Sequence, residues 1–551
     1  MDTAHQRQND ADINWVDNLL GRAKDLIGFS ACPTPAGGRV VSSSIECQPI
    51  KPSDGSTDGR CAVTYTDLVA PPPSTTWILT RGALVAIAVA VLSISLSGIM
   101  WLTSAYDNAI LKLVSIRDDI DMVFDLWRLP PTRPTLAVYP FHYKNFEAVI
   151  EGKELPEVEE RGPFIYREKS ERVNIAFHNN ATVSFQESKN LTFDESRSNG
   201  KMSDNITTPN VPLIVFLKKA STFFFIEQKL LGQFFQSLKA EPFHTVAIGD
   251  FMWGYEDDFF KTLAAMLVNL GKPRPQPFGF IAKRKGVHHD VITERTGADD
   301  PYSIGVITHW AGAERTGAWG NTSCDLIEGS DGTIFPAGAV REGKPLYIYS
   351  HDMCRRVPIQ FKGTVESRDG FPVQLYNMDD NMFNFSVINE ANQCYQLDGA
   401  YPPTGCFHAS PCQNDVPIFF SFPHFWNSGE ELKSSIKGFR PDPHKHRSFF
   451  HIHKNLGISM LVKSRIQLNV MLQRSSFISQ SARLKKEKLI LPIAWMEYDS
   501  GELPEHFVNT IYHLTFTVNW VEAVLRWTFT LCAIASVIYL AVGMRKNYKI
   551  C

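Results

Sequence analysis

The sequence predicts an α+β membrane protein in which a large, mainly antiparallel β domain with a helical insert is anchored by two transmembrane helices. Three observations lead to this prediction. Two long uncharged runs lie near the two ends of the 551-residue chain, short alternating segments dominate the part between them, and one stretch of that part is helical in pattern. The formal net charge of −3 lacks the basic excess of nucleic-acid-binding proteins, so no nucleic-acid partner is expected.

The two uncharged runs cover residues 82–106 and 527–544. About 20 apolar residues cross the hydrocarbon core of a bilayer as a helix, so transmembrane helices are expected within 77–106 and 521–544. Buried core helices are the alternative, and the length of the first run argues against it. That run also begins too far along the chain to be a cleavable signal peptide.

Five Asn-X-Ser/Thr sequons lie between the two runs and none lies outside them. Together with the basic residues that follow the second run, they favour residues 107–520 as a glycosylated extracellular or lumenal domain. Both tails, 1–76 and 545–551, are then cytoplasmic. The expected glycosylation sites are Asn180, Asn190, Asn205, Asn321 and Asn384.

Residues 1–76 are rich in Gly, Pro, Ser and Asp and predict a mostly disordered tail. Only the stretch 13–29, INWVDNLLGRAKDLIGF, places apolar side chains at helical spacing. The alternative for this stretch is a short amphipathic helix that lies on the membrane or binds a partner.

Short strands are expected where β-branched and aromatic residues alternate with polar ones between turn residues. These segments are 303–310, 345–350, 417–422, 444–453 and 458–472. The pattern is typical of an antiparallel β domain with one solvated face. Residues 211–270 are helical in pattern instead, from a Pro212-led apolar run to WGYEDDFFKTLAAMLVNL.

No motif of a familiar catalytic centre is present: the sequence lacks a GxSxG elbow, a phosphate-binding GxxxxGK[ST] loop, an HExxH helix and a CxxC pair. We therefore expect no catalytic residue, no cofactor and no enzyme activity. The stretch 394–412, CYQLDGAYPPTGCFHASPC, is a candidate zinc site. Its cysteines are more widely spaced than the close pairs of zinc ligands, so no metal is expected.

The ten cysteines fall into two groups. Those of the tails and the second run are expected to be reduced thiols, with acylation as an alternative for the last two: Cys32, Cys47, Cys61, Cys532 and Cys551. The other five lie in the oxidising compartment, where disulfides form: Cys324, Cys354, Cys394, Cys406 and Cys412. Their odd number leaves the pairing open.

The stretch HKHRSFFHIHK holds two histidine pairs, His444 with His446 and His451 with His453. Residues two apart lie on one face of a strand. The pairs could form a metal site or a sensor of endosomal pH, because histidine titrates just below neutrality. An exposed polar strand face is the alternative.

Seven segments, in order through the domain, resemble the class B scavenger receptors, a family that includes the fatty-acid translocase, the lysosomal integral membrane protein and insect croquemort. They are RGPFIYRE (161–168), FMWGYEDDFF (251–260), TERTGADDPYSIGVITHWAGAERTGAW (293–319), CDLIEGSDGTIFP (324–336), PIFFSFPHF (417–425), HKHRSFFHIHKNLG (444–457) and LILPIAWM (489–496).

The resemblance implies a β-rich ectodomain with an apical helical bundle, here 211–270, and a hydrophobic tunnel from that apex toward the membrane. Family members bind lipids (fatty acids, sterols, carotenoids or phospholipids), lipoproteins, or apoptotic and microbial surfaces, and move lipid through the tunnel into the bilayer. The implied function is a scavenger-type receptor that transfers lipid to the membrane, with homo-oligomerisation left open.

The resemblance also points to ligand-binding residues at the apex. Of a lysine pair in the fatty-acid translocase, Lys239 is kept and Ser237 stands at the companion position, which weakens the case for carboxylate-specific capture. Apical phenylalanines are further candidates for lipid contact, with the core of the bundle as the alternative: Phe223, Phe224, Phe225, Phe234 and Phe235. Burial of a long acyl chain, at ~0.8 kcal/mol for each methylene, contributes far more in total than the ~0–1 kcal/mol of one exposed ion pair. Lys239 would therefore mainly steer an anionic ligand toward the site.

For the cysteines, the resemblance implies disulfides Cys354–Cys412 and Cys394–Cys406. Many relatives have a Cys-x-Cys where this chain has Cys394, Tyr395 and Gln396, so Cys324 is expected to be unpaired. Where relatives commonly have acidic residues, this chain has His451 and His453, which implies a strand that becomes cationic at endosomal pH.

A lysosomal membrane protein that sorts a hydrolase is the alternative function within the same fold, in a lysosomal or endosomal membrane. The C-terminal RKNYKIC lacks an acidic-dileucine address, which favours the cell membrane. A two-span ion channel has the same topology, but such ectodomains usually carry many more cysteines than the five here. A membrane-anchored hydrolase is disfavoured by the missing nucleophile motif.

Overall fold

The structure is a computed structural model that describes residues 81–548 with short gaps at 114, 119–120, 321–322, 368–369, 371, 386–389, 398–400 and 477. The described residues belong to one compact unit, Ile78–Cys551. The stretch 13–29, the cysteines of the tail, Cys551 and the sequon Asn321 lie outside the described residues.

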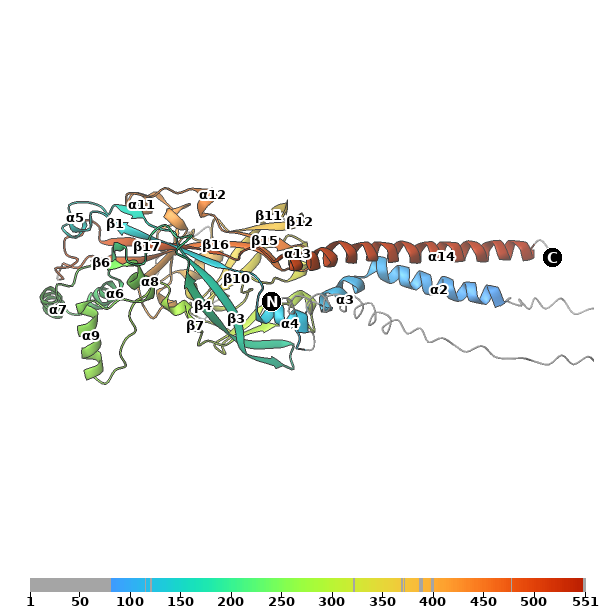
Figure 1. The fold of residues 1–551 in the computed structure, drawn as a ribbon, viewed down its shortest axis with the longest axis horizontal. Helices are drawn as coiled ribbons and strands as arrows, with labels where there is room; N and C mark the ends of the chain where they lie inside the picture. Colours follow the sequence, from blue (N-terminus) through green and yellow to red (C-terminus); the bar gives the residue numbers. More distant parts are fainter. Residues whose placement is uncertain are drawn as a thin grey trace, which may run out of the picture. The chain divides into compact units, whose positions relative to one another are not determined.

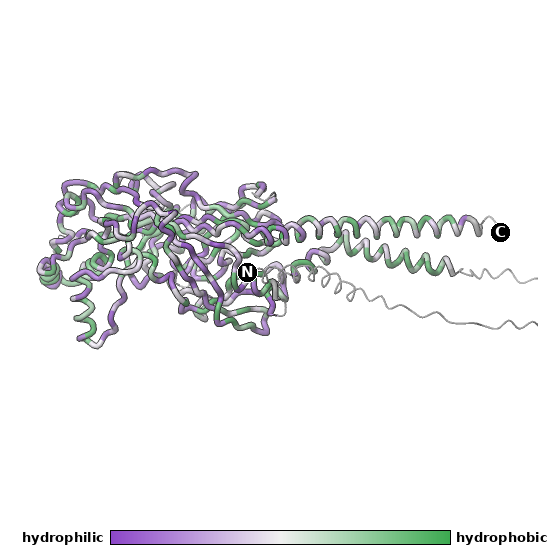
Figure 2. The backbone as a smooth tube through the Cα atoms, viewed as in Figure 1, coloured by the Kyte–Doolittle hydropathy of each residue, from purple (hydrophilic) through white to green (hydrophobic). Residues whose placement is uncertain are grey.

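Two long helices, α2 (Arg81–Leu102) and α14 (Val518–Tyr548), lie side by side (Figure 1) and are largely hydrophobic (Figure 2). Both are long and apolar enough to cross a membrane, over Gly82–Leu102 and Val518–Gly543, and little of either is buried. This exposure argues against the alternative of core helices. Polar contacts join the pair: Thr530 Oγ1 lies 2.9 Å from Ser97 Oγ and accepts from Trp101 Nε1 at 3.1 Å.

The domain between these helices is built on a 15-stranded sheet in which all strand pairs are antiparallel, as predicted. The main path runs β10 (Leu346–Ser350), β11 (Arg355–Glu366), β12 (Pro372–Met378), β15 (Phe449–His453), β16 (Ser459–Gln473), β17 (Lys488–Asp499), β1 (Thr135–Tyr143), β3 (Phe164–His178), β4 (Thr182–Phe193), β8 (Ile292–Arg295), β9 (Ile307–Trp310). Off this path lie β2 (Val158–Glu160), β7 (Gly286–Val287), β13 (Cys406–His408) and β14 (Ile418–Ser421).

Shorter elements connect the strands. The helices are α3 (Ala105–Leu113), α4 (Asp121–Arg128), α5 (Phe146–Ile150), α10 (Ala337–Arg341), α11 (Glu430–Lys433), α12 (Pro443–His446) and α13 (Glu505–Tyr512), which continues through the π-helical turn His513–Thr517 into α14. The 3-10 turns are Ala282–Arg284, Pro301–Ser303, Ser323–Asp325, His351–Met353, Glu390–Tyr395, Ser410–Cys412 and Pro423–Phe425.

The register of the strands defines one interior face. Tyr166 of β3 is opposite Leu136 of β1, and Leu136 is opposite Tyr498 of β17. Residues directly opposite in an antiparallel pair point to the same side of the sheet, and Leu136 and Tyr166 are both fully buried. The interior face therefore continues across β17, β1 and β3, and onward to β4.

The segment 211–270 holds α6 (Val211–Ala220), α7 (Phe225–Ser237), α8 (Ile248–Trp253) and α9 (Asp258–Asn269), with the hairpin of β5 (Asn205–Pro209) and β6 (Phe243–Ala247) beside them. Two caps tie these helices together. Asn210 accepts from Leu213 N and Asp257 from Phe260 N, and Asn210 Nδ2 donates to Asp257 Oδ2 at 2.7 Å. In Figure 1, α7 and α9 lie at the opposite end of the β domain from α14.

The disulfides correct one predicted pairing. Cys354 bonds to Cys412, as expected, but Cys394 bonds to Cys324 and not to Cys406. The Cα atoms of Cys324 and Cys394 are 6.1 Å apart, within the usual range for a disulfide. Cys406 is a free, fully buried thiol that packs in a different hydrophobic cluster from these two, on the opposite face of β13 from Phe407, which shares their cluster.

The first histidine pair is not on a strand. Pro443 begins the short helix α12 and Asp442 caps it, because Asp442 Oδ1 accepts from His444 N at 2.8 Å. His444 is exposed, whereas His446 is buried and stacks on His424 with ring centroids 4.6 Å apart. The predicted single strand face holding both imidazoles is therefore wrong for this pair.

Candidate functional site

An apolar surface lies on α7, α9 and the loop before α7. Eight large hydrophobic side chains are exposed there, from 41% for Phe223 to 81% for Phe224. Clustered exposed apolar residues of this kind usually mark a binding surface. We call this set the apical apolar surface: Phe223, Phe224, Phe225, Ile226, Leu230, Met266, Val268 and Leu270.

Hydrogen bonds hold the loop that carries the phenylalanines. The buried Gln228 donates through Nε2 to the carbonyls of Ser221 and Phe223, at 3.2 and 2.8 Å, and its Oε1 accepts from Ser475 Oγ at 2.9 Å. Phe224 N donates to Glu227 Oε2 at 3.0 Å. The loop is fixed before any ligand arrives, which lowers the entropic cost of binding.

The phenylalanines separate into surface and core. Phe223, Phe224 and Phe225 are exposed, as the contact prediction requires, and Phe234 is half-buried. Phe235 is fully buried and packs edge-on against Phe216 and Phe259, at 5.5 and 5.6 Å between ring centroids.

Helical geometry explains the division. Gln228, Gly232 and Phe235 recur at four and three residues along α7 and form its buried face. Phe235 therefore belongs to the core of the bundle, and its prediction as a surface contact is wrong. Sequence reasoning missed Met266, Val268 and Leu270, although the apolar character around the C-terminal half of α9 was a usable signal.

Lys239 follows α7 and is exposed, with a left-handed φ of 50°. It takes part in none of the ion pairs found among the described residues. Ser237, at the companion position, donates its hydroxyl to Phe234 O at 2.7 Å. Lys239 is thus an exposed cation just beyond the C-terminal end of α7, and Lys229 is a second one on the helix itself.

The second histidine pair does not form a cationic strand. His453 is buried, its Nδ1 accepts from Leu456 N at 3.2 Å, and burial lowers its pKa to about 4. Burial also lowers the pKa of the half-buried His451. Burial thus favours the neutral form of His453 at pH 5.5, and the pH-sensing role of the pair stays a prediction.

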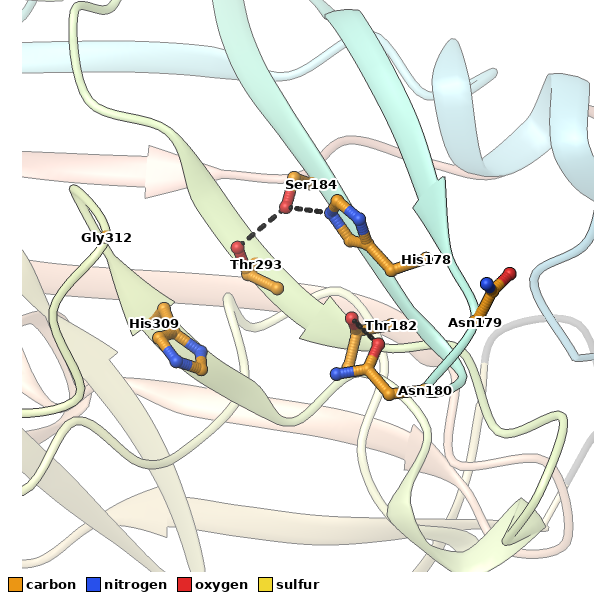
Figure 3. A pocket seen from close by; sticks show the side chains of 8 residues that line it. All are labelled: His178, Asn179, Asn180, Thr182, Ser184, Thr293, His309 and Gly312. Carbon is orange, nitrogen blue, oxygen red and sulfur yellow. Dashed lines mark hydrogen bonds between the residues drawn. The ribbon is translucent and has the colours of Figure 1, made fainter.

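A polar pocket of about 420 Å³ lies on β4, β8 and β9 (Figure 3). Its lining residues are His178, Asn179, Asn180, Thr182, Ser184, Thr293, His309 and Gly312. His178 Nε2 lies 2.7 Å from Ser184 Oγ, which also lies 2.8 Å from Thr293 Oγ1. No carboxylate orients His178 in the described part of the chain, so the pair lacks the third group of a hydrolase triad.

The sequons lie at accessible positions. Asn180, Asn190 and Asn205 are exposed and Asn384 is half-buried. Asn180 is also at the rim of the polar pocket, where its Oδ1 accepts from Thr182 Oγ1 at 2.7 Å. A glycan on Asn180 would extend beside this pocket; glycosylation itself stays a prediction.

Comparison with known proteins agrees with the resemblance seen in the sequence. The family model described as the CD36 family matches residues 84–544. Scavenger receptor class B member 1 of Rattus norvegicus is 29% identical over 422 residues, which cover 75% of this chain and 79% of that protein. Lysosome membrane protein 2 of Rattus norvegicus is 30% identical over 379 residues (68% and 76%), and that of Homo sapiens 27% over 395 residues (71% and 80%). The chain belongs to the CD36 family.

Proposed function

We propose that this protein is a scavenger-type membrane receptor that binds lipid surfaces through the apical apolar surface and passes lipid through its β domain to the membrane. The observation that carries the proposal is the concentration of exposed hydrophobic side chains on α9, which Asp257 caps, and on α7 with its hydrogen-bonded preceding loop. Such a surface benefits neither the stability of the fold nor its solubility, because apolar area in contact with water is unfavourable.

The energetics favour apolar capture. Phe224 and Leu270 are 81% and 72% exposed, and complete burial of such a side chain contributes about 1.5–3 kcal/mol. An exposed ion pair through Lys239 contributes only about 0–1 kcal/mol. Lipids, lipoproteins, or apoptotic and microbial surfaces are therefore the partners we propose, with Lys239 steering anionic ones.

The membrane arrangement is part of the same proposal. Both tails are cytoplasmic, residues 107–520 lie outside the cytosol, and the cell membrane is the site of action. A lysosomal membrane is the alternative, since one set of relatives is named lysosome membrane protein 2. Endoglycosidase treatment of the full chain tests the orientation, because cytosolic sequons would show no shift in mass.

The test of the apical apolar surface uses cells that express the full chain and fluorescent phosphatidylcholine vesicles. The double substitution Phe224→Gln with Leu270→Gln should weaken vesicle binding by about tenfold or more, because two exposed apolar contacts are lost. Val287→Gln is the matched control, since Val287 is 51% exposed but lies on β7. Equal binding by the double variant and the control would contradict the proposal.

A further inference from the structure

The interior face of the β domain carries a set of charged groups. We call it the interior polar cluster: Glu168, Arg172, Glu187, Lys189, Glu294 and Asp331. Charged side chains are expensive to bury unless they are paired or hydrogen-bonded. Their presence inside the domain therefore needs a reason.

Strand register shows that these side chains point inward. Arg172 is opposite Glu187 across β3 and β4, and Glu294 of β8 is opposite Val183 of β4, which is fully buried. Tyr498 of β17 lies near the same groups. Burial raises the pKa of its hydroxyl, and the negative charges of Glu168, Glu187 and Asp331 raise it further. Groups from four strands and one loop thus face a common interior region.

Arg172 and Glu294 hold one side of the cluster. Arg172 donates to Asp331 Oδ2 at 2.5 Å and to the carbonyl of Trp127, whose indole N–H donates to Glu294 Oε1 at 2.6 Å. Arg172 and Glu294 are only 6% and 1% exposed. Even so, Arg172 Nε and Glu294 Oε2 have no hydrogen-bond partner among the described residues. Buried polar atoms without partners are uncommon, and each needs an explanation.

The balance of charge in the cluster is negative. Burial, with the nearby Asp331, raises the pKa of Glu294 to about 8, so this carboxyl is mostly protonated at pH 7. The remaining carboxylates, Glu168, Glu187 and Asp331, outnumber Arg172 and Lys189; Arg284, which also acts on Lys189, is paired with Asp352 and leaves this balance unchanged. Another anion would therefore be repelled.

The other side of the cluster borders an interior space. Lys189 Nζ lies 2.9 Å from Glu187 Oε2, and each side chain keeps 27% of its surface accessible. Val183 and Leu191 lie on the same face of β4 and are buried, at 0% and 4%. Burial by itself shifts the pKa of Lys189 down and that of Glu187 up, and the attraction between the two groups, with Glu168 near Lys189 and Arg172 near Glu187, reverses both shifts. Glu187 and Lys189 therefore keep accessible surface on the face of β4 that buries Val183 and Leu191, so the core is not closed around this pair.

We propose that Lys189 and Glu187 form an interior subsite for the hydroxyl head of an uncharged lipid, so that the protein prefers a long-chain alcohol to the corresponding carboxylate. A hydroxyl can donate to Glu187 and accept from Lys189 at once. A carboxylate would have to compete with Glu187 for Lys189 inside a negatively charged cluster. This inference rests on the proposed function, because lipid must enter the domain.

The test compares two probes of equal chain length, radiolabelled hexadecan-1-ol and hexadecanoate, binding to the purified full chain in detergent. The natural chain should bind the alcohol about tenfold more tightly than the carboxylate. This ratio corresponds to the free energy of one charge interaction or one hydrogen bond to a charged group. Glu187→Gln should reverse the preference, because it leaves Lys189 free to pair with the carboxylate. Glu171→Gln is the control: Glu171 lies next to Arg172 on β3 but pairs with Arg128 at the surface.

The outcomes separate this subsite from the proposed function. A gain of hexadecanoate binding in Glu187→Gln supports the subsite, since misfolding cannot create affinity. Equal binding of both probes by the natural chain, or an unchanged preference in Glu187→Gln, overturns the subsite and leaves lipid binding intact. Failure of the natural chain to bind either probe overturns the subsite together with the proposed lipid transfer.

Discussion

The apical apolar surface and the interior polar cluster reverse the usual distribution of residues. At the apex, Phe224 is 81% exposed, in a loop that hydrogen bonds to Glu227 and Gln228 hold in place. In the interior, Arg172 and Glu294 are almost wholly buried. Hydrophobic residues are normally inside and charges outside, so both regions cost stability. We therefore expect each region to be retained for binding rather than for stability, and substitutions that separate the two properties test this expectation.

The largest expected effect comes from the interior. Arg172→Leu leaves the mostly buried carboxylate of Asp331 without its cation, and loss of one partner of a buried pair costs about 3–5 kcal/mol of unfolding free energy. Thermal unfolding of the full chain in detergent, followed by tryptophan fluorescence, measures this loss. Arg128→Leu is the control, because Arg128 is 35% exposed and its pair with Glu171 is at the surface. Equal small losses in both variants would show that the cluster is hydrated like the surface.

The apex should show the opposite division between stability and binding. Phe235→Ala should cost about 3–5 kcal/mol of unfolding free energy, because it leaves a cavity against Phe216 and Phe259. Phe224→Ala should leave the unfolding temperature nearly unchanged and weaken vesicle binding instead. A large loss of stability in Phe224→Ala would show that its ring is part of the core.

The contrast explains which features the sequence could predict. Charge-free runs and period-two alternation predict the two long helices and the strands because each is a local signal. The interior polar cluster has no such signal: FIYREKSERVNIAFH of β3 carries charges on both of its faces, so alternation does not tell the inner residues from the outer ones.

Other features depend on distance in space. Cys324 and Cys394 are 70 residues apart, and only the folded chain shows that Cys406 is in another cluster. The exposed phenylalanines could be predicted as a group from STFFFIEQKLLGQFFQSLK. Phe235 could not be separated from Phe224 until the buried face of α7 was known.

The smallest expected effect concerns pH and the buried histidines, His446 and His453. Burial, together with the neighbouring His424 in the case of His446, lowers the pKa of both to about 4, below the usual value of 6.5. As the pH falls below 6.5, these histidines therefore bind protons in the unfolded chain but not in the folded chain. Stability is fully present above pH 6.5 and is lost toward pH 4, by about 1 kcal/mol per histidine between pH 7.4 and 5.5.

Unfolding temperatures of the full chain at pH 7.4 and 5.5 measure this loss, and the difference should shrink in His453→Gln. His289→Gln is the control, because His289 is exposed. An unfolding temperature that rises on acidification would contradict this expectation and would mean that these imidazoles gain a carboxylate partner when charged. An unfolding temperature that falls on acidification would support the view that burial sets the ionisation state of both histidines, as it does for the interior groups Arg172 and Glu294.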